Sequence, residues 1–268
     1  MSRNQKIFRF AIRATALIAV LVLFIFINQK RKNFIVNEVK VQLPGDTTLK
    51  FLTEEDVLGI LKDKQIPFKG TSLSDLNVNA IESAIQMHPA VKEVTVWNSQ
   101  DGILSIEVIQ RNPVLRVMDL LNDNYYIDEE GNFMPAMSNF TARVPVANGF
   151  ITDRFHQKNM SIKEVLEDDS LSKSGITDDL FKFISLIRQD SFLTALTEQF
   201  YVNMEGEIEI VPKAGPETIL LGDAMDAEDK LNRMRLFYTK GLPSAGWNTY
   251  KSINLKYKEQ IICTKKTL

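Results

Sequence analysis

The sequence has very few of the residues that usually carry covalent or metal-bound chemistry. It contains 1 cysteine and 2 histidines among 268 residues. Cys263 has no second cysteine for an internal disulfide, and no Cys/His cluster has the spacing of a structural zinc site. His88 and His156 lie far apart in the chain, and neither has a carboxylate at metal-ligand spacing. We therefore expect no metal ion and no cofactor.

An excess of charge of one sign is also lacking. The formal net charge is -2, so the composition gives no electrostatic argument for nucleic-acid binding. Two short basic groups are present, at residues 30–32 and 265–266. We assign the first to lipid headgroups beside an apolar segment and the second to a solvated tail.

Known catalytic motifs are lacking as well. The chain has no phosphate-binding loop, no dinucleotide fingerprint and no zinc-protease motif. We interpret its acidic runs as helix starts or solvated turns, His88 as a residue that bonds carbonyls at a helix end, and Cys263 as a structural thiol. Two classes stay open at this point: a membrane-tethered scaffold that binds partners through sheet edges, and an enzyme whose site is assembled from scattered polar residues. The sequence favours a protein that is not an enzyme.

The chain does contain a long apolar run near its N-terminus. Residues 14–27 read ATALIAVLVLFIFI without a polar face, and residues 10–12 lengthen the run with only Arg13 between. We predict a transmembrane helix over residues 10–29 after a cytoplasmic tail, residues 1–9. A buried core helix and a cleaved signal peptide are the alternatives, and no small-residue cleavage site follows the run. Basic residues flank both ends, so charge favours a cytoplasmic N-terminus only slightly.

Residues 34–111 predict a small α/β unit in the order strand, helix, helix, strand, strand. Period-two alternation marks strands at residues 34–43, 91–97 and 102–110. Thr53 and Asp56 have capping-box spacing at the start of the first helix, and Pro89 stops the second helix. The string NSQDG predicts a hairpin between the last two strands. The sheet of such a sandwich leaves an edge exposed, and exposed edges recruit other chains.

Residues 112–262 predict a larger, strand-rich unit with flanking helices. Short strands surround the turns of residues 124–134 and 200–212, and further strands are expected at residues 142–151 and 218–223. Helical spacing marks residues 176–189 and 225–241. The closing segment, YKSINLKYKEQIICT, is predicted as one half-buried strand with Ile253, Leu255, Tyr257 and Ile261 on one face. Residues 263–268 are expected to form a C-terminal tail.

The order of these strings resembles the FtsQ/DivIB family of bacterial cell-division proteins. HPAVKEVTVW and GILSIEVIQRNPVLRV resemble the helix-to-strand junction and closing strand of the family's POTRA domain. YYIDEEGNFMP and LLGD…DKLNRMRLFY…YKSINLKYKEQII resemble the opening turn and the closing elements of its β domain. Ala90 replaces the usual aromatic residue and Gln110 the usual glutamate. The variants look most like members from the Bacteroidota.

The resemblance implies a fold, a location and a role. The fold is α+β: one N-terminal transmembrane helix, a POTRA domain (residues 34–111) and a β domain (residues 112–262). The protein is expected in the inner membrane at the division septum, with a cytoplasmic N-terminus and periplasmic domains. Its implied role is a non-enzymatic divisome scaffold that binds FtsB/DivIC-type and FtsL partners and helps control septal peptidoglycan synthesis. No small-molecule substrate is implied.

The resemblance also implies a partner-binding site. In the family, the last β-domain strand accepts a strand from FtsB, by main-chain hydrogen bonds. The matching positions in this sequence are Lys256, Tyr257, Glu259, Gln260 and Ile261, and Arg233 on the preceding helix matches the arginine that supports the contact. The alternative is a membrane-tethered periplasmic POTRA module that acts in outer-membrane protein assembly or transport.

Overall fold

The computed structural model describes residues 15, 17–20, 22, 35–99, 101–158, 160–172 and 175–266. The chain forms two compact units, Met1–Gln110 and Arg111–Leu268, each described by itself below. The expected cytoplasmic tail (1–9) lies outside the described residues, and of the expected transmembrane helix (10–29) only residues 15, 17–20 and 22 are described. Within the part of the chain that is described, no helix combines the length and apolar character needed to cross a membrane.

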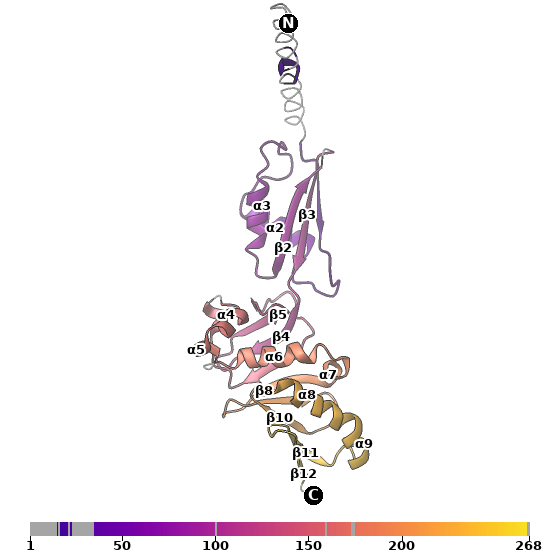
Figure 1. Cartoon of the computed structure of the whole chain (residues 1–268). Helices are drawn as coiled ribbons and strands as arrows, with labels where there is room; N and C mark the ends of the chain where they lie inside the picture. The colour runs from indigo at the N-terminus through magenta and orange to yellow at the C-terminus, as the bar shows by residue number, and fades with distance from the viewer. Residues whose placement is uncertain are drawn as a thin grey trace, which may run out of the picture. The chain divides into compact units, whose positions relative to one another are not determined.

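The first unit is a three-stranded sheet with two helices on one face (Figure 1). Its elements follow the predicted order: β1 (Glu38–Gln42), α2 (Glu54–Asp63), α3 (Val78–Gln86), β2 (Val91–Asn98) and β3 (Ile103–Gln110). The strand order is β1-β3-β2, with β1 parallel and β2 antiparallel to the central strand β3. Both β1 and β2 are therefore edge strands.

Local sequence signals explain where the helices of this unit begin. The Thr53 hydroxyl accepts a hydrogen bond from the Asp56 N–H (3.3 Å), and the Asp56 carboxylate accepts one from the Thr53 N–H (2.9 Å). This is the predicted capping box, and it starts α2. The Asn77 side chain caps α3 by accepting a hydrogen bond from the Ala80 N–H. The predicted apolar faces meet in the core, which includes Val57, Leu61, Ile81, Ala84, Ile85, Val96, Leu104, Ile106 and Val108.

His88 lies at the junction between α3 and β2. Its Nδ1 atom accepts a hydrogen bond from the Ala90 N–H (3.3 Å), so its side chain shapes the turn after Pro89. The side chain was expected to bond helix carbonyls, but it is the backbone N–H of His88 that donates to a helix carbonyl, that of Ile85 (3.0 Å). Burial lowers the pKa of His88, because desolvation disfavours its charged form. Ala90, which replaces an aromatic residue of the family pattern, is fully buried.

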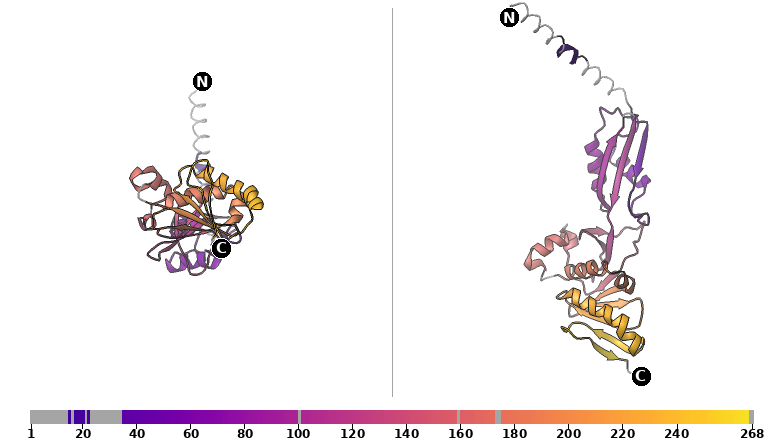
Figure 2. Two further views of the ribbon diagram at one scale, coloured as in Figure 1. Left: turned by 90° about the horizontal axis from the view of Figure 1, so that it is seen from below. Right: turned by 45° about the vertical axis from the view of Figure 1, so that its right-hand side comes forward.

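The second unit is built on a nine-stranded sheet of order β12-β11-β10-β9-β8-β7-β4-β5-β6 (Figure 2). Its strands are β4 (Pro113–Met118), β5 (Asn124–Asp128), β6 (Phe133–Pro135), β7 (Val146–Gly149), β8 (Thr197–Val202), β9 (Ile208–Pro212), β10 (Thr218–Gly222), β11 (Tyr250–Asn254) and β12 (Ile262–Lys265). Pairing is antiparallel within β4-β5-β6, within β8-β9-β10 and between β11 and β12. It is parallel where β7 joins β4 and β8, and where β10 joins β11.

Helices cover one face of this sheet (Figure 1). They are α4 (Ile162–Glu167), α5 (Asp169–Ser172), α6 (Thr177–Ile187), α7 (Ser191–Leu196), α8 (Ala227–Leu236) and α9 (Leu242–Ala245), with the 3-10 helix η1 (Phe155–Lys158) and the π-helix η2 (Phe237–Gly241). The apolar stripe of α6 (Leu180, Phe183, Ile184 and Ile187) packs with Phe200, Ile210, Ile219 and Ile253 of the sheet in one core cluster. The mixed α+β class and the two strand-and-helix units agree with the prediction.

Among the described residues, one type of five-residue turn closes four hairpins. In each turn, the N–H of the first residue donates to the carbonyl of the fifth residue, and the N–H of the fourth residue donates to the carbonyl of the first residue. The first residues are Ser99, Asp119, Asp128 and Asn203. The fourth residues, which have positive φ, are Gly102, Asn122, Gly131 and Gly206. The three glycine turns were predicted, whereas the Asp119 turn was missed because an asparagine supplies the left-handed conformation there.

The closing segment differs from its prediction. The expected single strand is two strands, β11 and β12, separated by a loop at residues 255–261. Leu255 is fully buried, but Tyr257 is exposed in the loop, so the two do not share a face. Cys263, Thr264 and Lys265 lie in β12, and the expectation of a tail from residue 263 is wrong for them. Their pairing with β11 satisfies backbone groups that a tail would leave to water.

Candidate partner-binding edge

β12 is an edge of the nine-stranded sheet, and its outward backbone groups can be identified. The Leu255 N–H donates to the Leu220 carbonyl on β10. Backbone groups alternate in direction along a strand, so Ser252 and Asn254 point theirs to β12, where they pair with Thr264 and Ile262. The N–H and C=O groups of Cys263 and Lys265 consequently point away from the sheet. Among the described residues, no side chain hydrogen-bonds to the backbone of β12.

The opposite edge of the same sheet is a poorer template. β6 spans only Phe133–Pro135, and Pro135 has no N–H to donate. Short edge strands and edge prolines are both devices that discourage strand addition. Of the two edges of this sheet, β12 is the better acceptor for a partner strand.

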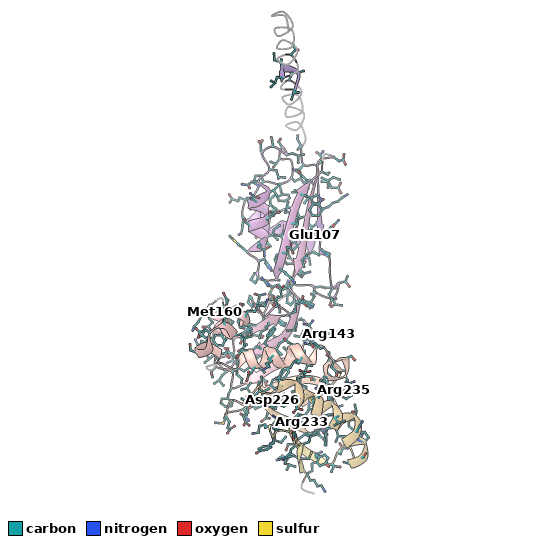
Figure 3. All side chains as sticks on the ribbon, in the orientation of Figure 1. Glu107, Arg143, Met160, Asp226, Arg233 and Arg235 are labelled. Carbon is teal, nitrogen blue, oxygen red and sulfur yellow. The ribbon has the colours of Figure 1, made fainter. Side chains whose placement is uncertain are left out.

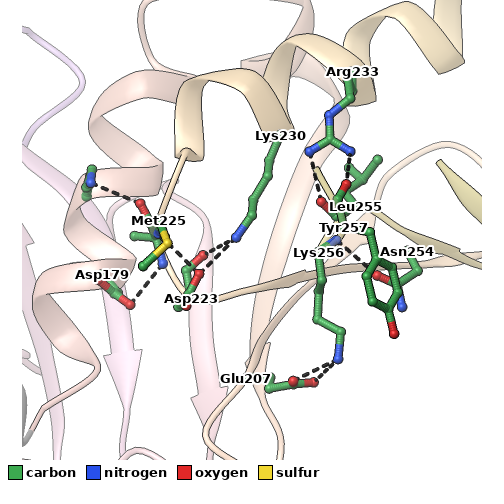
Figure 4. A network of polar contacts seen from close by, with 12 residues as sticks. Asp179, Glu207, Asp223, Met225, Lys230, Arg233, Asn254, Leu255, Lys256 and Tyr257 are labelled. Carbon is green, nitrogen blue, oxygen red and sulfur yellow. Dashed lines mark hydrogen bonds and ion pairs between the residues drawn. The ribbon is translucent and has the colours of Figure 1, made fainter. Parts of the chain in front are cut away.

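Arg233 on α8 holds the loop that precedes β12 (Figures 3 and 4). Its Nη1 atom donates to the carbonyls of Tyr257 (2.8 Å) and Gln260, and its Nη2 atom donates to the carbonyl of Leu255 (3.0 Å). The Nε atom donates to the Asp229 carboxylate one turn earlier on α8, at 2.8 Å. The arginine side chain is 12% exposed. Arg233 therefore binds the loop itself and has little surface left for direct contact with a partner.

Lys256 is fixed by a second ion pair in the same loop (Figure 4). Its Nζ atom lies 2.7 and 2.8 Å from the two carboxylate oxygens of Glu207, next to the start of β9. The Glu207 carboxylate raises the pKa of Lys256, because the charged amine is favoured beside it. The Lys256 N–H also donates to the Asn254 side chain. The loop is thus tied both to α8 and to the sheet.

The remaining predicted site residues share the loop but not one environment. Tyr257 is 53% exposed, and its ring is free to contact another molecule. Glu259 has positive φ (58°) and is exposed, as is Gln260, whose carbonyl is used by Arg233. Ile261 packs partly against the core. The sequence did not indicate Ile262, which is 45% exposed on β12, or Trp247, which is 46% exposed after α9.

Side chains with metal-binding potential do meet elsewhere in the second unit. One ligand atom each of Asp119, Asp123 and His156 lies within 4.8 Å of the others. The sequence spacing did not indicate this cluster, because η1 brings His156 to the β4–β5 turn. Asp119 accepts hydrogen bonds from the N–H groups of Leu121 and Asp123. Asp123 is bonded by His156 (3.4 Å) and by Gln157. These bonds give the cluster a structural role, holding η1 to the turn.

The free thiol of Cys263 does not have the surroundings of a nucleophile. Burial raises its pKa, which disfavours the reactive thiolate. Its side chain lies on the core side of β12, opposite Ile253 of β11. The interpretation of Cys263 as a structural thiol fits this position.

Other buried charges serve to fix loops. The Lys230 Nζ atom donates to the backbone carbonyl (2.8 Å) and the carboxylate (3.0 Å) of Asp223, between β10 and α8 (Figure 4). Lys230 lowers the pKa of Asp223 through this hydrogen bond. The Tyr238 hydroxyl donates to buried Glu217 at 2.6 Å, and burial, with Glu217, raises the pKa of Tyr238. Each of these groups already has a structural partner.

Fold and edge together define a two-unit α+β protein whose larger unit offers a sheet edge for a partner strand. The family model described as FtsQ/DivIB, C-terminal related, matches residues 112–264, and a POTRA-like domain model matches residues 35–109. The first match covers more than half of the chain, so the chain belongs to the FtsQ/DivIB, C-terminal related family. The resemblance drawn from the sequence is thereby confirmed, and membership indicates a role in cell division.

A curated relative gives a shorter match. The chain is 38% identical over 63 residues to the cell division protein FtsQ of Myxococcus fulvus. The match covers 24% of this chain and 22% of the relative. The chain thus spans about a fifth of the length of the curated relative it matches, and the activity and partners of that whole protein are not transferred by this similarity.

Proposed function

We propose that the chain is a non-enzymatic scaffold of the division machinery that accepts a strand from a partner along β12. The observation that carries the proposal is the outward backbone of Cys263 and Lys265, beside a loop held by Arg233. Main-chain hydrogen bonds would supply affinity, and side chains on either face would supply specificity. We further propose FtsB/DivIC-type and FtsL proteins as partners, and a role in controlling the septal peptidoglycan synthase.

The location belongs to the same proposal. A scaffold of this kind would be held in the inner membrane by the apolar run of residues 10–29, with both folded units in the periplasm. It would gather at the septum through its partners. Depletion followed by microscopy tests this role: filamentous cells without septa support it, and normal division contradicts it.

Two groups of residues have different proposed roles at the site. Tyr257, Ile262 and the outward backbone of β12 contact the partner. Arg233, Lys256, Glu259, Gln260 and Ile261 shape the loop that presents them. The two roles are assigned from the exposure of the side chains. Tyr257 is half exposed, whereas the guanidinium of Arg233 is occupied by loop carbonyls.

A proline substitution tests the edge directly. Lys265→Pro removes an outward N–H and leaves the residues that pair inward with β11 in place. We expect it to weaken binding of the purified partner by about tenfold or more, because a main-chain hydrogen bond is lost and its acceptor stays unpaired. Lys265→Ala, which keeps the N–H, is the matched control and should bind like the wild type. Isothermal titration with each variant gives the comparison.

Tyr257→Glu tests the loop in the same titration. The side chain is exposed, so the midpoint of thermal unfolding should stay within a few degrees of the wild type while partner affinity falls. Unchanged affinity for both Lys265→Pro and Tyr257→Glu would show that the partner binds elsewhere.

The POTRA-like match leaves a second candidate, a tethered module of outer-membrane protein assembly. The two candidates predict different co-purified proteins from solubilised membranes. Division proteins support the scaffold, and barrel-assembly proteins support the alternative.

A further inference from the structure

The edge strand β2 of the first unit is covered by two side chains of α3. The Glu82 carboxylate accepts a hydrogen bond from the Val96 N–H at 3.0 Å. One helical turn later, the Gln86 side-chain amide donates to the Lys92 carbonyl at 3.2 Å. Both backbone groups lie on the side of β2 that faces away from β3. We call Glu82 and Gln86 the edge cover.

The two backbone groups that the edge cover binds lie on either side of Val94, near the centre of the strand. Residues of the same parity in a regular stretch point their backbone groups the same way, so Val94 faces outward with Val96. The register of β2 shifts between Val91 and Glu93, and at this irregularity the bond from Gln86 shows that the Lys92 carbonyl also faces outward. The odd-numbered residues Glu93 and Thr95 face β3, with which they pair at Ile109 and Glu107. An additional strand could pair with β2 only after displacing both side chains of the edge cover.

Without the edge cover, the outward edge of β2 could pair with the same edge of a second copy of the chain. In an antiparallel two-fold pairing centred on Val94, Lys92 lies opposite Val96 of the second copy, and Glu93 lies opposite Thr95. The Val96 N–H and the Lys92 carbonyl, the two groups that the edge cover occupies, then become partners of each other across the axis. No like charges lie directly opposite, and valine meets valine at the centre.

We propose that the edge cover closes a latent homodimer interface along β2, and that Glu82 and Gln86 keep two copies of this chain from pairing there. Edge strands with unpaired N–H and C=O groups promote association unless they are blocked. β12 lacks such a cover among the described residues. The edge cover therefore blocks strand addition at β2, whereas the outward backbone of β12 stays accessible.

Removing the edge cover tests the proposal. In the full-length Glu82→Ala/Gln86→Ala variant, sedimentation velocity should show dimers at protein concentrations about tenfold below those at which the wild type associates. At dilutions where this variant is monomeric, hydrogen exchange at the Val96 amide should accelerate, because the bond to Glu82 is lost. The single variant Glu82→Gln keeps an acceptor oxygen for the Val96 N–H and should associate and exchange like the wild type. The Glu55→Ala/Asn79→Ala variant loses the same chemical groups from exposed helix positions and should remain like the wild type.

Two further substitutions identify the edge. Val94→Pro in the uncovered variant removes an outward N–H of β2 and should abolish the dimer, whereas Lys265→Pro on β12 should not. An uncovered variant that associates no more than the wild type, with fast exchange at Val96, would contradict the latent interface. Unchanged exchange at Val96 in the monomeric uncovered variant would contradict the edge cover. A dimer suppressed only by Lys265→Pro would mean that the wrong edge was assigned. None of these results depends on a division partner, so they are separable from failure of the proposed function.

Discussion

At the scale of single residues, Arg233 has the clearest structural role in the candidate site. Its guanidinium donates to three loop carbonyls and to Asp229. The family resemblance suggested Arg233 as a site residue but could not indicate its partners, because backbone carbonyls carry no sequence signal. The capping box of Thr53 and Asp56 could be predicted, since both partners are side chains at a fixed spacing.

Replacing Arg233 by alanine should destabilise the second unit by about 1–3 kcal/mol, because three charged hydrogen bonds to loop carbonyls are lost. Urea unfolding measures this change. Arg235 on the same helix offers a matched control, since its side chain is 56% exposed and pairs only with Asp190. Arg235→Ala should cost about 0–1 kcal/mol, as exposed ion pairs do. Equal effects of the two substitutions would contradict the loop-holding role.

At the scale of elements, regular patterns were predictable and irregular ones were not. The two helices of the first unit and the glycine turns were expected from periodicity and turn chemistry. The break between β11 and β12 was not, because the apolar spacing of Ile253, Leu255 and Tyr257 continues through it. The loop is set by tertiary contacts, namely those of Arg233 and the Lys256–Glu207 pair, together with positive φ at Glu259. Such contacts override a period-two pattern.

The strand β7 depends on one glycine. Gly149 has φ of 100°, and a side chain there would collide with the carbonyl oxygen of Val202 on β8. Gly149→Ala should therefore destabilise the unit by about 2–4 kcal/mol in urea unfolding. Gly206 also has positive φ, but open space surrounds it, so Gly206→Ala should cost only about 1–2 kcal/mol. A smaller cost at Gly149 than at Gly206 would contradict the close approach.

At the scale of the whole molecule, the chain separates into two units with their own cores. The structure divides between Gln110 and Arg111, and the sequence suggested a change of domain near residues 111–112. The sequence suggested this change because the strand–helix–helix–strand–strand order of the first unit is complete by residue 110. The order of strands in the larger sheet could not be predicted from the sequence. Parallel pairings such as that of β4 with β7 join segments that carry no pairing signal in the sequence.

If the partner edge lies wholly in the second unit, that unit should be sufficient for binding. The fragment Arg111–Leu268 is expected to unfold in one cooperative transition, because its core cluster draws only on its own residues. Its partner affinity should lie within about twofold of the full chain, which titration measures. A folded fragment that no longer binds would show that the first unit contributes to the site.

The position of β7 also has a consequence for how fast the larger sheet assembles. The groups β4-β5-β6 and β8-β9-β10 are antiparallel meanders whose strands are close in sequence, whereas β7 pairs in parallel with both β4 and β8. Loop closure for such distant pairs is slow compared with hairpin formation. The two meanders should form early, and docking through Val146–Gly149 should limit the rate of refolding. The parallel pairings of β7 with β4 and β8, and of β10 with β11, should thus set the time scale on which the two edges become parts of one sheet.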